Sequence, residues 1–148
     1  MSVTIEINQS GVKKNARFPE DHITRVAKKT LKAIKKNNVH LSIALVTPED
    51  IRKINKEYRG KDKSTDVLSF QLEKEKNTVE KNAYWGEVII CPTVAKKQAH
   101  LFFNTYEKEM SRLLVHGILH IAGYDHHTNK EKTIMFGLTD RILATLRT

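Results

Sequence analysis

Three histidines near the end of the chain have the spacing of ligands for a metal ion. His116 and His120 are four residues apart in a stretch predicted to be helical, so both rings emerge from one face about one turn apart. Gly123 should end that helix, and the loop behind it brings His126 back toward the same point. Three neutral imidazoles that converge in this way are typical of a zinc site with an open fourth coordination position, the arrangement of catalytic zinc.

Other interpretations of the histidines stay open at this point. Two histidines four residues apart are common on surface helices that bind no metal, so the prediction depends on Gly123 and His126 as well. His127 is an alternative third ligand, because adjacent side chains in an extended loop point to opposite sides; the spacing favours His126. The remaining histidines stand alone and are expected to be surface or partly buried side chains: His22, His40 and His100.

The spacing H-x-x-x-H-x-x-G-x-x-H also occurs in metzincin proteases. In H-E-x-x-H proteases, a Glu follows the first histidine and serves as the general base. Gly117 stands at that position here and has no side chain that could accept a proton, which disfavours a protease. A metal can still lower the pKa of bound water and polarise a phosphoryl oxygen, so hydrolysis of phosphodiesters fits the residues better.

The charge of the chain agrees with a polyanionic partner. The 148 residues include 26 Lys and Arg against 17 Asp and Glu, a formal net charge of +9. An excess of this size favours nucleic acid or an acidic membrane surface, although a merely solvated basic surface would look the same. A single cysteine, Cys91, excludes a disulfide framework. With no signal peptide and no apolar run long enough for a membrane span, we expect a soluble cytoplasmic protein.

Hydrophobic periodicity predicts the elements that must position the histidines. Strands are expected at Val3–Asn8, His40–Val46, Thr65–Leu72 and Gly86–Cys91, and the last, a nearly continuous apolar run, should be central in the sheet. Helices are expected at about 20–37, 48–58, 92–101, 104–123 and 129–146, and the fourth should start with a capping box formed by Asn104 and Glu107. Residues Glu73–Tyr84 lack periodicity and are expected to form an exposed loop or hairpin tip.

This order of elements predicts an α+β protein. One domain over residues 1–148 is expected, in which a small mixed four-stranded sheet packs with about five helices. The metal site should then lie at a helix end and in the loop that follows it.

Three segments resemble one known family. The run HGILHIAGYDH, residues His116–His126, resembles the H-G-x-L-H-x-x-G-Y-D-H signature of the YbeY family of bacterial rRNA maturation factors. Residues 58–70, with YRGKD and TDVLSF, and residues 86–91, GEVIIC, are similar to two further family blocks in the same order. In its order of elements, the resemblance covers essentially the whole chain.

The resemblance implies a metal-dependent, single-strand-specific endoribonuclease in ribosomal RNA processing, notably 3′ maturation of the small-subunit rRNA, and in ribosome quality control. It implies one zinc ion held by His116, His120 and His126, with catalysis by His116 and Arg59. The Arg59 guanidinium, which matches the family's functional arginine, would bind a phosphate bidentately. The implied partners are rRNA, the ribosome or its small subunit and ribosome-associated proteins, without a membrane.

Other interpretations of these residues and of the whole protein stay open. Arg59 could instead be a structural loop residue paired with Asp62 or Asp66. Asp125 could orient a ligand histidine or merely cap the loop at the surface. The whole protein could be an RNA-binding ribosome-assembly factor whose metal is structural and whose nuclease activity is negligible.

The sequence departs from the family at one position. Gln71 follows Phe70 where the family usually has proline, a residue that would remove a donor from the strand ladder. We therefore expect that the strand can continue toward Glu73–Tyr84, which affects the edge of the sheet and leaves the metal site unchanged.

Overall fold

The computed structural model describes residues 3–72 and 84–146. Its strands are β1 (Val3–Asn8), β2 (Val39–Leu45), β3 (Val67–Gln71) and β4 (Tyr84–Ile90). Its helices are α1 (Glu20–Ala33), α2 (Pro48–Arg59), α3 (Pro92–Leu101), α4 (Tyr106–Ile121) and α5 (Asn129–Thr145), with a short 3-10 helix, η1 (Lys14–Ala16), after β1. The α+β class, the four strands and the five helices predicted from the sequence are confirmed.

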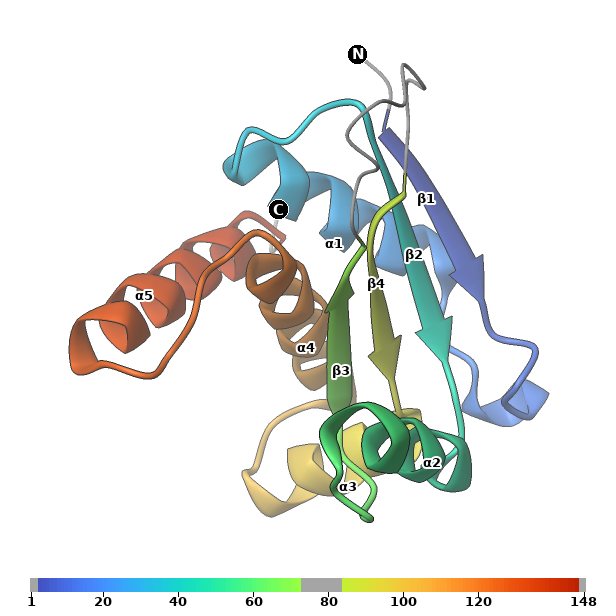
Figure 1. Cartoon of the computed structure of the whole chain (residues 1–148). Helices are drawn as coiled ribbons and strands as arrows, with labels where there is room; N and C mark the ends of the chain where they lie inside the picture. Colours follow the sequence, from blue (N-terminus) through green and yellow to red (C-terminus); the bar gives the residue numbers. More distant parts are fainter. Residues whose placement is uncertain (1–2, 73–83, 147–148) are drawn as a thin grey trace.

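The four strands form one mixed sheet in the order β1-β2-β4-β3 (Figure 1). β1 and β2 are parallel, as are β2 and β4, whereas β3 runs antiparallel to β4. β4 is therefore an inner strand, as its apolar run predicted, and β3 is an edge strand. The antiparallel edge brings β3 beside the C-terminal half of α4, where the histidines lie.

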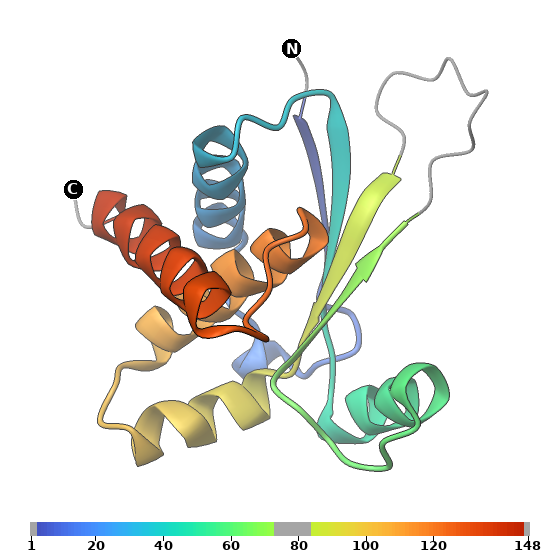
Figure 2. The ribbon, with the colours of Figure 1, turned by 60° about the vertical axis from the view of Figure 1, so that its left-hand side comes forward.

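Helices cover the sheet unequally. In two views, α1, α4 and α5 lie on one side of the sheet and α2 lies beyond its other side (Figures 1 and 2). α4 is the central helix of the first layer, with fully buried apolar side chains that include Leu114, Ile118 and Leu119. A smaller cluster around Ile51 and Cys91 attaches α2 to the sheet. Because α4 is fixed by the core along its length, the residues on its remaining face are held rigidly.

Two helix boundaries differ from those predicted. α1 ends at Ala33 and not near residue 37, because Lys35 and Asn38 adopt left-handed φ values of 56° and 54°, which a helix cannot continue through. The N-cap of α4 is Thr105 and not Asn104. The Thr105 hydroxyl accepts a hydrogen bond from the Lys108 N–H at 3.1 Å, while the Asn104 side chain accepts one from the Thr105 N–H.

The strand that contains Gln71 continues through that residue. Gln71 pairs with Gly86, and the Leu72 N–H donates to the Trp85 carbonyl at 3.2 Å. The predicted loop at Glu73–Tyr84 lies outside the described residues except for Tyr84, which begins β4. Within residues 3–72 and 84–146, no helix is long and apolar enough to cross a membrane.

Gly117 lies at a close approach between α4 and the sheet. A Cβ atom there would lie 2.7 Å from a Val88 methyl carbon and 3.1 Å from the Ser69 hydroxyl, closer than real side chains approach. The same Ser69 hydroxyl donates to the Gly117 carbonyl at 3.0 Å, which links β3 to α4. The missing side chain thus lets the helix that carries the histidines lie directly on β4.

We expect Gly117→Ala to destabilise the protein although alanine favours helices. Overpacking typically costs about 1–3 kcal/mol, which exceeds the helix-propensity gain of up to about 1 kcal/mol. Gly137→Ala, in α5, is the matched control, because a Cβ there meets nothing within 4 Å and should stabilise the protein. Thermal unfolding of both variants checks the pair, and a Gly117→Ala protein that is as stable as Gly137→Ala would contradict this packing.

Candidate metal centre

The three predicted ligand histidines meet at the C-terminal end of α4. His116 and His120 are one turn apart on the helix, and their Nε2 atoms are 3.1 Å apart. His126 lies in the loop after α4, with its ring centroid 5.7 Å from that of His116 and 5.2 Å from that of His120. One nitrogen of each ring lies within 4.8 Å of the other two. This confirms that the chain brings these three side chains together.

Gly123 produces the turn that returns the chain to the helix end. Its φ of 102° is left-handed, and its N–H donates to the His120 carbonyl at 3.0 Å. The Tyr124 N–H donates to the Leu119 carbonyl at 3.0 Å, which completes a Schellman motif. The loop after Gly123 then carries His126 over the open face of α4. The sequence prediction of a left-handed glycine at this position is confirmed.

The donor set fits a single zinc-type ion. Two nitrogens bound to one tetrahedral zinc at about 2.0–2.1 Å are about 3.3 Å apart, close to the 3.1 Å between His116 and His120. Burial, followed by the neighbouring His120, lowers the pKa of His116 to about 4. Burial and the nearby His126 also lower the pKa of His120. Both imidazoles are therefore neutral near pH 7, the form that binds metal.

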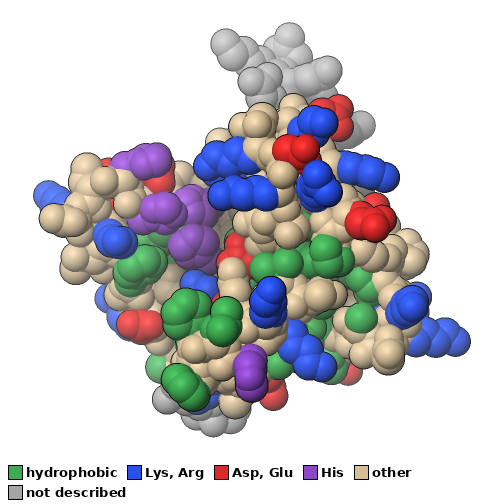
Figure 3. Space-filling model, turned by 90° about the horizontal axis from the view of Figure 1, so that it is seen from below, with side chains coloured by type: hydrophobic (Ala, Val, Ile, Leu, Met, Phe, Trp, Pro, Cys, Tyr) green, Lys and Arg blue, Asp and Glu red, His purple; other side chains and the backbone are tan. Residues whose placement is uncertain are grey.

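The three histidines open into a cleft of about 550 Å³ between β3 and the end of α4. The lining of the cleft also includes Arg59 at the end of α2 and residues of β3 such as Ser69 and Gln71. The view from below shows the histidines gathered at the left of this face, beside a hollow (Figure 3). A metal held by the histidines would therefore face a cleft that reaches solvent.

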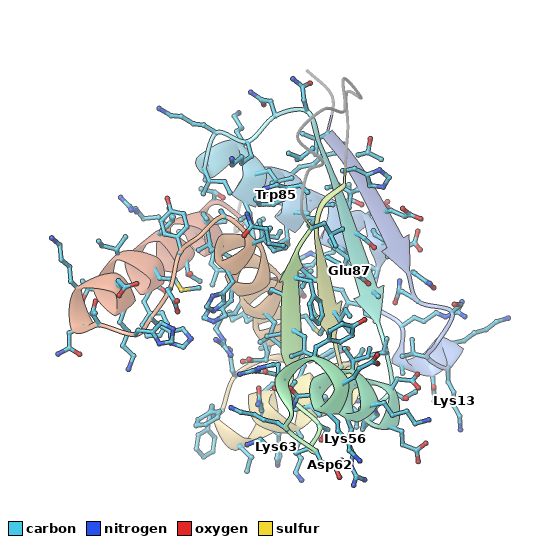
Figure 4. The ribbon with its side chains drawn as sticks, viewed as in Figure 1. Lys13, Lys56, Asp62, Lys63, Trp85 and Glu87 are labelled. Atoms are coloured by element: carbon cyan, nitrogen blue, oxygen red, sulfur yellow. The ribbon has the colours of Figure 1, made fainter. Side chains whose placement is uncertain are left out.

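Arg59 lines this cleft together with Asp66 but forms an ion pair with neither of its proposed structural partners. Asp62 is bound by Arg52, whose Nε donates to it at 2.7 Å, and lies 4.0 Å from Lys56 (Figure 4). The Asp66 carboxylate accepts from the Val67 N–H at 2.8 Å and from the Thr65 hydroxyl. Within the described part of the chain, Arg59 forms no ion pair. Its exposed guanidinium is thus available to an anion that enters the cleft.

Asp125 caps the loop and does not orient a ligand ring. One carboxylate oxygen accepts from the His126 N–H at 2.8 Å, and the other lies 3.0 Å from His127 Nε2. The hydrogen bond from the His126 N–H lowers the pKa of Asp125. His127 is 79% exposed and is absent from the group of three nitrogens, so His126 is the residue that the loop presents to α4.

Comparison with known proteins now places the chain in a family. Residues 4–147 match the sequence profile of the family described as Endoribonuclease YbeY. The chain belongs to this YbeY family. The Endoribonuclease YbeY of Sulfurihydrogenibium sp. is 49% identical over 122 residues, which is 82% of this chain and 79% of the relative. That of Staphylococcus epidermidis is 42% identical over 120 residues, 75% of this chain and 77% of the relative.

A solved structure shares the fold of this chain. The solution structure of TM1509 from Thermotoga maritima is 34% identical in sequence and superposes with a TM-score of 0.63. The similarity covers 95% of this chain and 87% of TM1509. The resemblance to the YbeY family is thereby confirmed, and with it the prediction that the chain is a member of an endoribonuclease family, a class of hydrolases.

The YbeY fold also explains why Gly117 disfavours a protease. The Cβ direction at residue 117 points toward Val88 and Ser69 of the sheet, and the residue is buried. A glutamate could not occupy this position without displacing β4, the inner strand. No general base from the helix can therefore follow His116 in the manner of the H-E-x-x-H proteases.

Some residues around the YbeY histidines were not identified from the sequence. Ser69 and Gln71 line the cleft only because β3 lies beside α4, a placement that no local pattern in the sequence indicates. Arg112 contributes to the lowered pKa of His116 and forms an ion pair with the buried Glu109. Its position one helical turn before His116 was a signal that could have identified it.

Gly123→Ala should weaken metal binding as well as stability in this YbeY chain. A non-glycine residue at a φ of 102° costs on the order of 1–2 kcal/mol, and relaxation of the turn would displace His126. We expect a lower Tm and a metal affinity reduced by about tenfold or more. Thermal unfolding checks the Tm, and calorimetric titration with zinc checks the affinity, each against wild type. Unchanged zinc affinity would show that the turn does not determine where His126 lies.

Proposed function

We propose that this protein is a zinc-dependent, single-strand-specific endoribonuclease. One observation carries the proposal: in a chain of the YbeY endoribonuclease family, three histidines converge in a cleft that also contains an exposed arginine. Three ligands leave a coordination position open, which a purely structural zinc site does not. The formal charge of +9 favours the approach of RNA.

The residues of the cleft would have different roles. His116 and His120 would hold one zinc ion from the rigid helix, and His126 would close the set from the loop. Bound zinc supplies Lewis-acid polarisation of a phosphoryl oxygen and acidifies water. Arg59 would bind the scissile phosphate across the cleft and offset the charge that develops on its oxygens. The wall formed by β3 limits the space around the bound strand.

We further propose rRNA as the physiological substrate, with 3′ maturation of the small-subunit rRNA and ribosome quality control as the processes. The partners would then be the ribosome or its small subunit and ribosome-associated proteins, in the cytoplasm. The signature His116–His126 and the basic composition support this assignment. The buried free thiol of Cys91 is compatible with a reducing compartment. A single domain over residues 1–148 would carry the whole activity.

Cleavage of an end-labelled RNA tests the proposal. Purified protein should cut the single strand at internal positions and leave the same strand intact when it is annealed to its complement. Addition of a chelator should stop the cleavage, and zinc should restore it. If well-folded, zinc-loaded protein binds the RNA without cutting it, the metal is structural and the chain acts as an RNA-binding assembly factor.

A further inference from the structure

A second groove lies at the opposite end of α4 from the histidines. It is about 690 Å³ and lies between η1, α3 and the first turn of α4. Its lining includes the apolar and aromatic side chains of Pro92, Leu101 and Tyr106. Tyr106 is fixed there by an edge-on contact with Phe18, at 5.6 Å between ring centroids. The groove therefore has a firm base that is independent of the metal site.

The rim of this groove is basic. Arg17 comes from the segment after η1, and Lys96, Lys97 and His100 come from α3, while no acidic residue is among those that line the groove. Lys96 and Lys97 are exposed, and neither forms an ion pair within the described residues. Four basic residues around one groove, without a carboxylate among the lining residues, favour a ligand with several negative charges.

Two exposed aromatic residues follow Leu101, a residue of the groove lining, along the chain. Phe102 is 75% exposed and Phe103 is 100% exposed in the turn between α3 and α4. Phe103 has a left-handed φ of 55°, which holds this bulky residue out on the turn. Seen from below, hydrophobic, basic and histidine side chains gather over α3 and this turn, on the same face as the histidine cluster (Figure 3).

We infer that this groove, with Phe102 and Phe103, is a second binding site for single-stranded RNA. Cationic side chains that follow a backbone, beside aromatic rings on which bases can stack, are the features by which proteins bind single strands. An acidic protein segment would satisfy the cations and leave the two exposed rings without a role. The inference rests on the proposed function and adds that the substrate is held at two places.

The dimensions of α4 set the length of RNA that can use both places. Tyr106 in the groove and His120 in the metal cleft are fourteen residues apart on one helix, about 21 Å at about 1.5 Å per residue. That length corresponds to roughly six stacked nucleotides at about 3.4 Å each. A strand of twelve nucleotides can therefore occupy the groove and the metal cleft together, whereas a tetranucleotide cannot.

Binding of fluorescein-labelled RNA to metal-free protein tests the inference without cleavage. We expect Lys96→Glu/Lys97→Glu to bind a twelve-nucleotide single strand about tenfold more weakly than wild type, with a smaller dependence on salt. Phe103→Ala should weaken the same binding by several-fold through lost stacking. A tetranucleotide, which cannot span the groove and the metal cleft, should bind wild type more weakly than the twelve-nucleotide strand does.

Lys28→Glu/Lys32→Glu on α1 is the matched control, because it reverses two exposed lysines and changes the net charge equally. The control should bind the twelve-nucleotide strand within about twofold of wild type after screening by salt. If both double variants lose RNA affinity equally, the loss comes from the change in net charge, and the inference is overturned. Full affinity of the groove variants for the twelve-nucleotide strand would also overturn the inference. Binding of the strand by zinc-loaded wild-type protein without cleavage would refute the proposed function alone.

Discussion

His116→Ala should lose its bound metal and its RNA cleavage together. His116 is the most buried of the three ligands and supplies the nitrogen closest to that of His120, so its removal leaves two donors that do not define a site. We expect the zinc content to fall below stoichiometry and the rate of cleavage to fall by about 10³ or more, because charge stabilisation by the metal is lost. Elemental analysis and cleavage of a labelled single-stranded RNA measure the two effects.

His127→Ala is the matched control for this variant. His127 adjoins the third ligand but is exposed and paired with Asp125, so its removal should leave zinc content and cleavage close to those of wild type. Purifying all three proteins side by side exposes a contaminating nuclease, which would cut in every sample. Cleavage by folded His116→Ala at the wild-type rate would show that the chemistry does not take place at this centre.

Arg59→Ala should retain its metal and lose most of its activity. The side chain lines the cleft opposite the histidines but is not part of the histidine group, so zinc binding does not depend on it. Loss of a positioned donor to a transition-state oxyanion typically costs about 10²–10³ in rate. We expect a decrease of this order in cleavage, with one zinc per chain and an unchanged Tm.

Two further arginine variants test whether the loss of activity comes from the guanidinium of Arg59 itself. Arg59→Lys should recover only part of the rate, since an ammonium group cannot bind a phosphate bidentately. Arg52→Ala removes an arginine from the same helix that is bound to Asp62 outside the cleft, and it should cleave nearly as well as wild type. Equal losses in Arg59→Ala and Arg52→Ala would indicate that Arg59 acts through the stability of α2.

The metal centre could be predicted from the sequence because its geometry is local. The spacing of His116 and His120 fixes their common face, and Gly123 marks where the chain turns back. The position of β4 inside the sheet was also visible in its apolar run. Each of these features depends on hydrophobic periodicity or on the backbone conformations open to one residue. Both can be recognised in a short segment of sequence without knowledge of the rest of the fold.

Features that depend on contacts distant in sequence could not be predicted in the same way. The cleft wall exists because β3 pairs with β4 and lies beside α4, which no segment encodes alone. The groove between η1 and α3 joins residues about eighty positions apart. At the level of single hydrogen bonds, Asn104 and Thr105 are both good caps, and the helix begins where the Thr105 hydroxyl reaches the Lys108 N–H.

Titration of metal-free protein with zinc tests the central claim most directly. Protein freed of metal by a chelator should not cleave single-stranded RNA, and activity should rise in proportion to zinc until one equivalent is bound. The same titration of His116→Ala should restore nothing. Full cleavage by demonstrably metal-free wild-type protein, or restoration of His116→Ala to the wild-type rate, would contradict a catalytic metal held by His116, His120 and His126.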